Sequence, residues 1–83
     1  MEEKLVGKIT HYYDKIQVAI VELFDDLKVG DNIHIKGHAT DFNQQVASIQ
    51  KDHQNVSSAS KGDLIGMKVD QKVKEGDEIY LIQ

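Results

Sequence analysis

Short runs in which apolar and polar residues alternate recur along this chain, and each run predicts a β-strand. In residues 32–36, Ile33 and Ile35 fall on one side while His34 falls on the other. Side chains that alternate with a period of two project from opposite faces of a strand, so one face can be buried while the other stays polar. The same alternation is present in two later runs, residues 64–69 and 78–82. We therefore expect a half-buried strand in each run.

The first part of the chain predicts a hairpin. Residues 5–13 and 16–23 are rich in β-branched side chains, and they meet at Asp14-Lys15, two residues that suit a hairpin loop. Strands that are apolar on both faces are typically covered on both sides, and we expect this of the second arm. One of its faces is made by Ile16, Val18 and Ile20, and the other by Ala19 and Val21.

The remaining segments complete a small all-β fold. Residues 44–50 alternate more weakly and predict a strand with a bulge or bend, while residues 56–59 form either a short strand or a connecting loop. Residues 22–27 have the apolar spacing of a helix but are too short for more than one turn. Short strands separated by turns are typical of barrels and sandwiches. We predict a single domain over residues 1–83, an all-β, closed or nearly closed antiparallel β-barrel of six to seven strands.

Glycine followed by aspartate marks three turns in this chain. Glycine reaches positive φ angles without a steric penalty, and an aspartate carboxylate can accept a hydrogen bond from the backbone two residues further on. Each pair directly precedes one of the alternating runs, so a turn is expected before each of those strands. The pairs are Gly30-Asp31, Gly62-Asp63 and Gly76-Asp77.

Composition narrows the classes of function. With 83 residues and no cysteine, the chain has no disulfide and no thiolate for a zinc site, so packing alone must stabilise it. The net charge is −4 and all ten basic side chains are lysines, a balance that disfavours general nucleic-acid binding. No apolar run is long enough for a membrane helix, and the acidic start at Glu2-Glu3 is unlike a secretory signal. We expect a soluble, cytoplasmic protein that contacts no membrane.

Several short motifs follow one another in a recognisable order. They are Val6-Gly7-Lys8-Ile9, residues 27–33, residues 46–50, Val56 with Ala59, residues 62–69 and residues 73–79. In this order the sequence resembles domain 2 of elongation factor Tu and related translation GTPases, and the small proteins called translation elongation factor-like. A similar barrel is the C-terminal accessory domain of a collagenase-like peptidase family. Such a resemblance transfers architecture better than function.

The resemblance implies a binding module without catalysis. Domain 2 of the translation GTPases contacts ribosomal RNA or the aminoacyl end of tRNA, so the leading hypothesis is a translation-associated module with ribosome or tRNA as partner. GTP hydrolysis is not expected, because Ser60-Lys61-Gly62-Asp63 lacks the first glycine and the final hydroxyl of a phosphate loop. The second hypothesis is a protein-interaction barrel that acts in trans, for example on a collagenase-like peptidase, through an apolar patch or a free strand edge.

Few side chains could carry chemistry. The histidines at positions 11, 34, 38 and 53 lack the spacing of metal ligands, so a metal-binding or small-ligand-binding barrel ranks last among the hypotheses. The serines at positions 57, 58 and 60 lie near Asp52 and His53 in sequence, but loop serines usually serve turns, and a catalytic triad is defined by its geometry. We expect no enzyme activity, no cofactor and no metal.

Aromatic residues near loops indicate where a partner would bind. Exposed aromatic side chains can stack on bases or hold a partner protein. The alternative is that Tyr13 and Phe42 fill the two ends of the barrel. The candidate binding face consists of Tyr12, His38, Thr40, Phe42 and Gln44. The sequence leaves the oligomeric state open.

Overall fold

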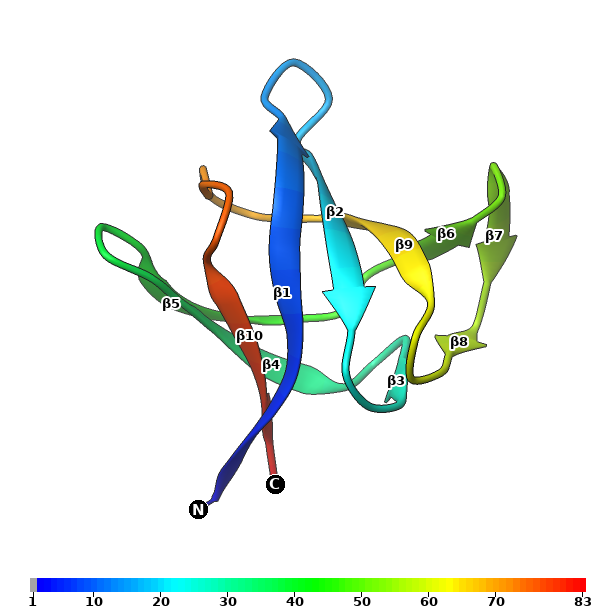
Figure 1. Cartoon of the computed structure of the whole chain (residues 1–83), viewed down its shortest axis with the longest axis horizontal. Coiled ribbons are helices and arrows are strands. Elements are labelled where there is room, and N and C mark those ends of the chain that lie inside the picture. The colour runs from blue at the N-terminus through cyan, green and yellow to red at the C-terminus, as the bar shows by residue number, and fades with distance from the viewer. Residues whose placement is uncertain (1) are drawn as a thin grey trace.

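The computed structural model describes residues 2–83, which form antiparallel strands joined by turns (Figure 1). No helix long and apolar enough to cross a membrane occurs among these residues. The strands are β1 (Glu3–Tyr13), β2 (Val18–Leu23), β3 (Leu27–Lys28), β4 (Asn32–Lys36), β5 (Asp41–Gln45), β6 (Ile49–Lys51), β7 (Gln54–Val56), β8 (Ser58–Ala59), β9 (Leu64–Lys68) and β10 (Glu78–Ile82).

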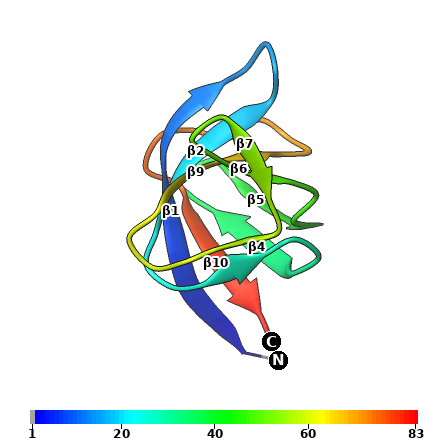
Figure 2. The same cartoon turned by 90° about the vertical axis from the view of Figure 1, so that its right-hand side faces the viewer.

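Most of the strands belong to one curled sheet. Its eight strands follow the order β5-β4-β10-β1-β2-β9-β6-β7, and β3 pairs with β8 in a separate two-stranded sheet. Figures 1 and 2 show how the large sheet bends around a central space, with the two chain ends side by side. The all-β, antiparallel prediction is confirmed, although ten strands replace the predicted six or seven. A closed barrel is not detected in residues 2–83, since the hydrogen-bonded order ends at β5 and β7.

A buried glutamine connects one end of the sheet to a distant segment. Gln44 of β5 is only 7 % exposed. Its Oε1 accepts a hydrogen bond from the backbone N–H of Asp70 at 2.8 Å, and its Nε2 donates to the backbone carbonyl of Lys68 at 3.1 Å. Lys68 is the last residue of β9, so the Gln44 side chain joins β5 to the segment that follows β9. No backbone pairing connects β5 with β9 in the sheet.

The core fills the inside of the curled sheet. The predicted alternation is confirmed in all three runs, since Ile33, Ile35, Ile65, Met67 and Ile79 are buried at or below 1 % exposure. The inner face of β2 also contributes to the core. The buried hydrophobic residues are Val6, Ile9, Ala19, Val21, Leu23, Leu27, Ile33, Ile35, Val46, Ile49, Ala59, Ile65, Met67, Val69, Val73 and Ile79.

Two irregularities in β1 decide which of its side chains face the core. The pairing with β10 shifts between Leu5 and Gly7, and the pairing with β2 shifts between Ile9 and His11. An extra residue in one strand resets the in-and-out alternation beyond it. As a result Tyr12 packs against the core cluster, whereas Tyr13 points outward and is 49 % exposed.

The first hairpin differs from its prediction in the length of its loop. β2 begins at Val18 rather than at Ile16, so the connection spans residues 14–17 instead of Asp14-Lys15 alone. Gln17 adopts a left-handed backbone with φ of 56°, and Ile16 is 62 % exposed within the loop. The outer face of β2 is only partly covered by residues 2–83, contrary to the expectation of a strand covered on both sides.

The three glycine–aspartate pairs lie in turns of one design. Gly30, Gly62 and Gly76 have φ angles of 97°, 90° and 94°, which glycine adopts without a Cβ penalty. In each turn the aspartate N–H donates to the carbonyl of the residue three positions earlier, and its carboxylate accepts from the N–H of that same residue. The carboxylate therefore accepts a hydrogen bond from a residue earlier in the chain, whereas the sequence predicted a bond to the backbone two residues further on.

Candidate interaction surfaces

The five residues proposed as a binding face do not share one exposed surface. Thr40 and Gln44 are buried, and the amide of Gln44 is engaged by the backbone of Lys68 and Asp70. Tyr12 and Phe42 are partly buried and pack against the core cluster. His38 is exposed in the loop between β4 and β5. Four of the five thus contribute to packing, and only His38 is freely accessible.

The two aromatic residues expected to fill the barrel ends have different positions. Phe42 packs against the core, as that alternative supposes, but Tyr13 is largely exposed. Tyr12 takes the inward position in place of Tyr13 because of the irregularity between Ile9 and His11. A bulge of this kind leaves no clear signal in the sequence, so alternation alone assigns the wrong tyrosine to the core.

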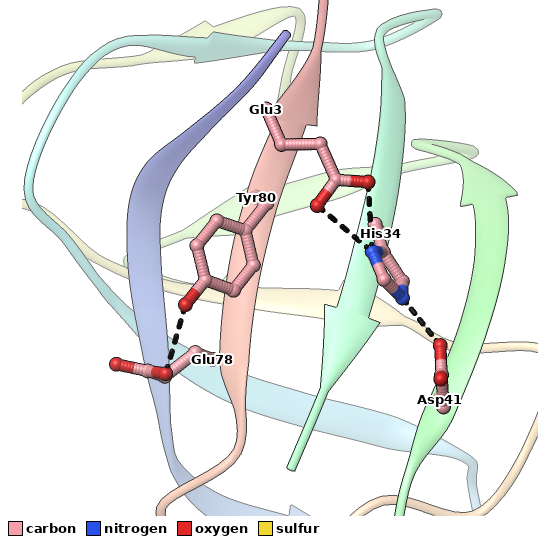
Figure 3. Close-up of polar contacts among 5 residues, drawn as sticks. All are labelled: Glu3, His34, Asp41, Glu78 and Tyr80. Atoms are coloured by element: carbon pink, nitrogen blue, oxygen red, sulfur yellow. Dashed lines mark hydrogen bonds and ion pairs between the residues drawn. The ribbon is translucent and has the colours of Figure 1, made fainter. Parts of the chain in front are cut away.

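A histidine held between two carboxylates lies on the outer face of the sheet (Figure 3). Nδ1 of His34 on β4 is 2.9 Å from Oε2 of Glu3 on β1, and Nε2 contacts the carboxylate of Asp41 on β5. The His34 side chain is only 14 % exposed. Glu3 can reach it because β10 alone separates β1 from β4 in the sheet. Sequence reasoning missed this group, since Glu3 is 31 positions away from His34.

The electrostatics of this group favour a charged histidine. An ionised carboxylate accepts hydrogen bonds but cannot donate them. Both ring nitrogens of His34 must therefore carry protons to bond with Asp41 and Glu3 at the same time. The hydrogen bond to Asp41, followed by the one to Glu3, raises the pKa of His34 above its ordinary value of 6.5. Both nitrogens are therefore occupied in holding β1, β4 and β5 together, which leaves neither as a free metal ligand.

Tyr80 lies beside this group and is also engaged. It stands opposite His34 in the β10–β4 pairing, and the two ring centroids are 6.4 Å apart. The Tyr80 hydroxyl donates to Oε1 of Glu78 at 3.0 Å, and this hydrogen bond raises the pKa of Tyr80. Among residues 2–83, no group of three or more histidine, aspartate or glutamate side chains is arranged to hold a metal ion.

The serines and the histidine considered for catalysis line separate grooves. Ser58 and Ser60 line a groove of about 470 Å³ beside β3 and β8, together with Asp26 and Asp31. His53 instead lines a groove on the outer face of β2 and β9. The carboxylate of Asp31 is bonded to the backbone N–H of Lys28 within its turn. The Asp31 carboxylate thus stabilises the turn.

The groove on β2 and β9, called here the apolar groove, is lined by the three most exposed large hydrophobic side chains of residues 2–83. It has a volume of about 480 Å³ and is bordered by the β1–β2 and β6–β7 hairpins. Ile16, Leu64 and Tyr13 line it and are 62 %, 59 % and 49 % exposed. The remaining lining residues are Val18, Ile20, Gln50, Asp52, His53, Ile65 and Gly66.

Comparison with known proteins relates the chain to part of certain proteases. It is 40 % identical to an uncharacterized protease of Methanocaldococcus jannaschii over 94 % of its own length and 19 % of the protease. It is 35 % identical to a collagenase of Porphyromonas gingivalis over 95 % of its length and 22 % of that protein. The chain thus spans about one fifth of these relatives. No family model matches it.

The fold has a close counterpart among solved structures. The C-terminal domain of a predicted U32 peptidase of Geobacillus thermoleovorans superposes with a TM-score of 0.90, covering 96 % of this chain and 93 % of that domain. The sequence identity is 16 %, so this likeness concerns the fold alone. The fold of the curled sheet is therefore also that of a C-terminal domain of a larger protein.

These comparisons correct the family resemblance inferred from the sequence. The assignment to translation elongation factor-like proteins is wrong, because the similar proteins are a protease, a collagenase and a domain of a predicted U32 peptidase. The proposed contact with ribosome or tRNA depended on that assignment and loses its support. The motifs were misleading because turns and strand starts such as Val29-Gly30-Asp31 report the barrel-like architecture, which unrelated functions share.

Proposed function

We propose that this chain is a non-catalytic accessory domain that binds a protease body, the larger part of a protein such as those it resembles. The observation that carries the proposal is the 40 % identity to about one fifth of a protease, over nearly the whole of this chain. A segment that recurs within proteases and has the fold of a solved C-terminal domain is suited to act beside a catalytic region.

The disposition of polar side chains supports a binding role over a catalytic one. A catalytic acid or base needs a partly free, well-placed proton donor or acceptor. Here His34 is held on both sides by carboxylates, and the Tyr80 hydroxyl is bonded to Glu78. The aspartates of the three turns hold backbone N–H groups. The polar groups with the strongest contacts thus stabilise the fold.

We further propose that the curled sheet behaves as a nearly closed, rigid barrel. Gln44 joins β5 to the chain beyond β9 through two hydrogen bonds to backbone atoms. The backbone N–H of Val46 also donates to the carbonyl of Asp31 at 2.9 Å, which extends the β4–β5 pairing beyond Gln45 and fixes the edge strand that Gln44 belongs to. A rigid platform lowers the conformational entropy lost on binding, which favours a docking role.

The proposal is tested by binding in trans. The M. jannaschii protease is prepared with its homologous segment deleted, and its affinity for this chain is measured by isothermal titration calorimetry. The protease's own excised segment is the positive control. We expect both to bind, and the affinity to change little between low and high salt, because apolar contacts are not screened. The proposal fails if the excised segment binds and this chain does not, or if neither binds.

A further inference from the structure

The apolar groove coincides with an unusual concentration of left-handed backbone. Gln17, Asp52 and His53 are the only non-glycine residues between positions 2 and 83 with positive φ, at 56°, 52° and 64°. Asp52 and His53 line the groove, and Gln17 lies between Ile16 and Val18, which also line it. Asp52 and His53 are the two residues of the β6–β7 hairpin loop, and such a tight turn has positive φ at both positions. The left-handed residues thus fix the shape of the hairpins beside the groove. Both hairpins that border the groove therefore carry this feature.

The strand beneath the groove is built for burial on both faces. Ala19 and Val21 on its inner face are fully buried. Val18 and Ile20 on its outer face are only half-buried, and Ile16 continues the same apolar row into the loop. Apolar residues on both faces are typical of a strand that lies between two layers. The core formed by residues 2–83 covers the inner face of β2. On the outer face, over the groove, these residues leave Val18 and Ile20 only half-buried.

The charges around the groove favour an uncharged, apolar occupant. Along the outer face of the β2–β9 pair, Val18 stands opposite Lys68 and Leu64 stands opposite Glu22. One side chain of each sign therefore borders the apolar row, and Asp52 and His53 line the groove from the β6–β7 hairpin, so the rim carries few charges and no basic cluster. A polyanion such as RNA, or a strongly charged peptide, gains little from such a rim.

We propose that the apolar groove is the surface through which this domain docks on a protease body, with an apolar element of that body filling the groove. This inference rests on the proposed function. The length of the similar proteins identifies the occupant: the segment matching this chain is 19 % of the M. jannaschii protease, so most of that protein lies outside it. In such a protein the missing outer layer over β2 and β9 is supplied by the larger part of the chain.

The test compares groove variants with a matched control on the same protein. Ile16→Asp and Leu64→Asp each place a carboxylate in the groove, whereas Val29→Asp makes the same change at an exposed position that lines neither of the two grooves described above. Binding to the segment-deleted M. jannaschii protease is measured for each. We expect Kd to rise about tenfold or more for the two groove variants, as for central interface residues, and less than threefold for the control. Circular dichroism and thermal melting verify that each variant folds.

A second measurement does not depend on charged substitutions. The chain has no cysteine, so Leu64→Cys and Val29→Cys each introduce a single thiol whose alkylation can be followed by mass spectrometry. Addition of the protease body should slow alkylation at position 64 and leave the rate at position 29 unchanged. Slowing at position 29 alone, or equal rates at position 64 with and without the bound body, overturns the groove as the docking surface.

The outcomes separate this inference from the function on which it rests. If the unaltered chain binds but the groove variants bind equally well, the groove is refuted and the accessory function stands. If the unaltered chain does not bind, the proposed function fails first. Sedimentation of the chain alone gives a third outcome: a dimer that Leu64→Asp converts into a monomer would show that a second copy fills the groove, which also overturns the proposal.

Discussion

Replacing Gln44 by alanine should cost much of the stability of this fold, although the residue is a single uncharged side chain. The substitution removes hydrogen bonds to the backbone of Lys68 and Asp70. Each is worth roughly 0.5–1.5 kcal/mol net, and the lost side-chain packing adds about 1 kcal/mol, giving a total of about 2–4 kcal/mol. A domain of this size has a free energy of unfolding of roughly 4–12 kcal/mol. The loss is therefore a large fraction of the whole.

Urea denaturation followed by circular dichroism measures this loss directly. Gln45→Ala is the matched control, because Gln45 is the adjacent residue of β5 and its side chain is exposed. We expect Gln44→Ala to shift the unfolding midpoint strongly with little change in slope, and Gln45→Ala to change the free energy of unfolding by about 0.5 kcal/mol or less. Equal losses in the two variants would refute the argument that Gln44 joins β5 to the chain beyond β9.

Three further predictions concern stability. Gly7→Ala should lower the free energy of unfolding in urea by about 1–3 kcal/mol, because the new Cβ would lie 2.8 Å from Cγ1 of Val21, and an unchanged midpoint would contradict this. Gly62→Ala should cost about 1 kcal/mol or more through its φ of 90° alone. Gly66→Ala is the milder comparison, because its new Cβ would meet side-chain atoms of Val18, Ile20 and Gln50 at 3.4 to 3.9 Å, and the reverse order of the two melting temperatures would refute the strain argument. The contribution of His34 to stability is fully present below pH 6.5, its ordinary pKa, and is lost as pH rises through its raised folded pKa, so His34→Gln should remove this part of the pH profile. Identical profiles for the two proteins would show that Asp41 and Glu3 do not favour its charged form.

The sequence predicts the strands better than it predicts their connections. Alternation places Ile33, Ile35 and Ile79 in the core correctly, because each lies in a short strand with one buried face. It fails where the period of two is interrupted. The irregularity in β1 exchanges the roles of Tyr12 and Tyr13, and the four-residue loop moves Ile16 out of β2. Register is set by neighbouring strands, which the local pattern does not contain.

The candidate surfaces were harder to predict because they depend on strand order. Glu3, His34 and Asp41 come together only after β10, the last strand of the chain, inserts between β1 and β4. Gln44 resembled an exposed polar residue of a weak strand, and its partners on the far side of the sheet are 24 and 26 positions away. One part of the groove was visible in the sequence, namely the apolar outer face of β2.

The positions of polar and apolar side chains in this domain support one conclusion about where binding occurs. His34, one of the histidines weighed as a ligand, and Gln44, one of the residues of the expected binding face, make contacts that hold separate strands together. Ile16, which the sequence placed in a strand covered on both faces, and Leu64 are the two most exposed large hydrophobic side chains of residues 2–83. Exposed apolar surface lowers solubility and gains nothing for the isolated fold, so its concentration in one groove is best explained by a partner that covers it. A domain arranged in this way can lose its partner without unfolding, because the interactions that stabilise it and the surface that binds use different residues.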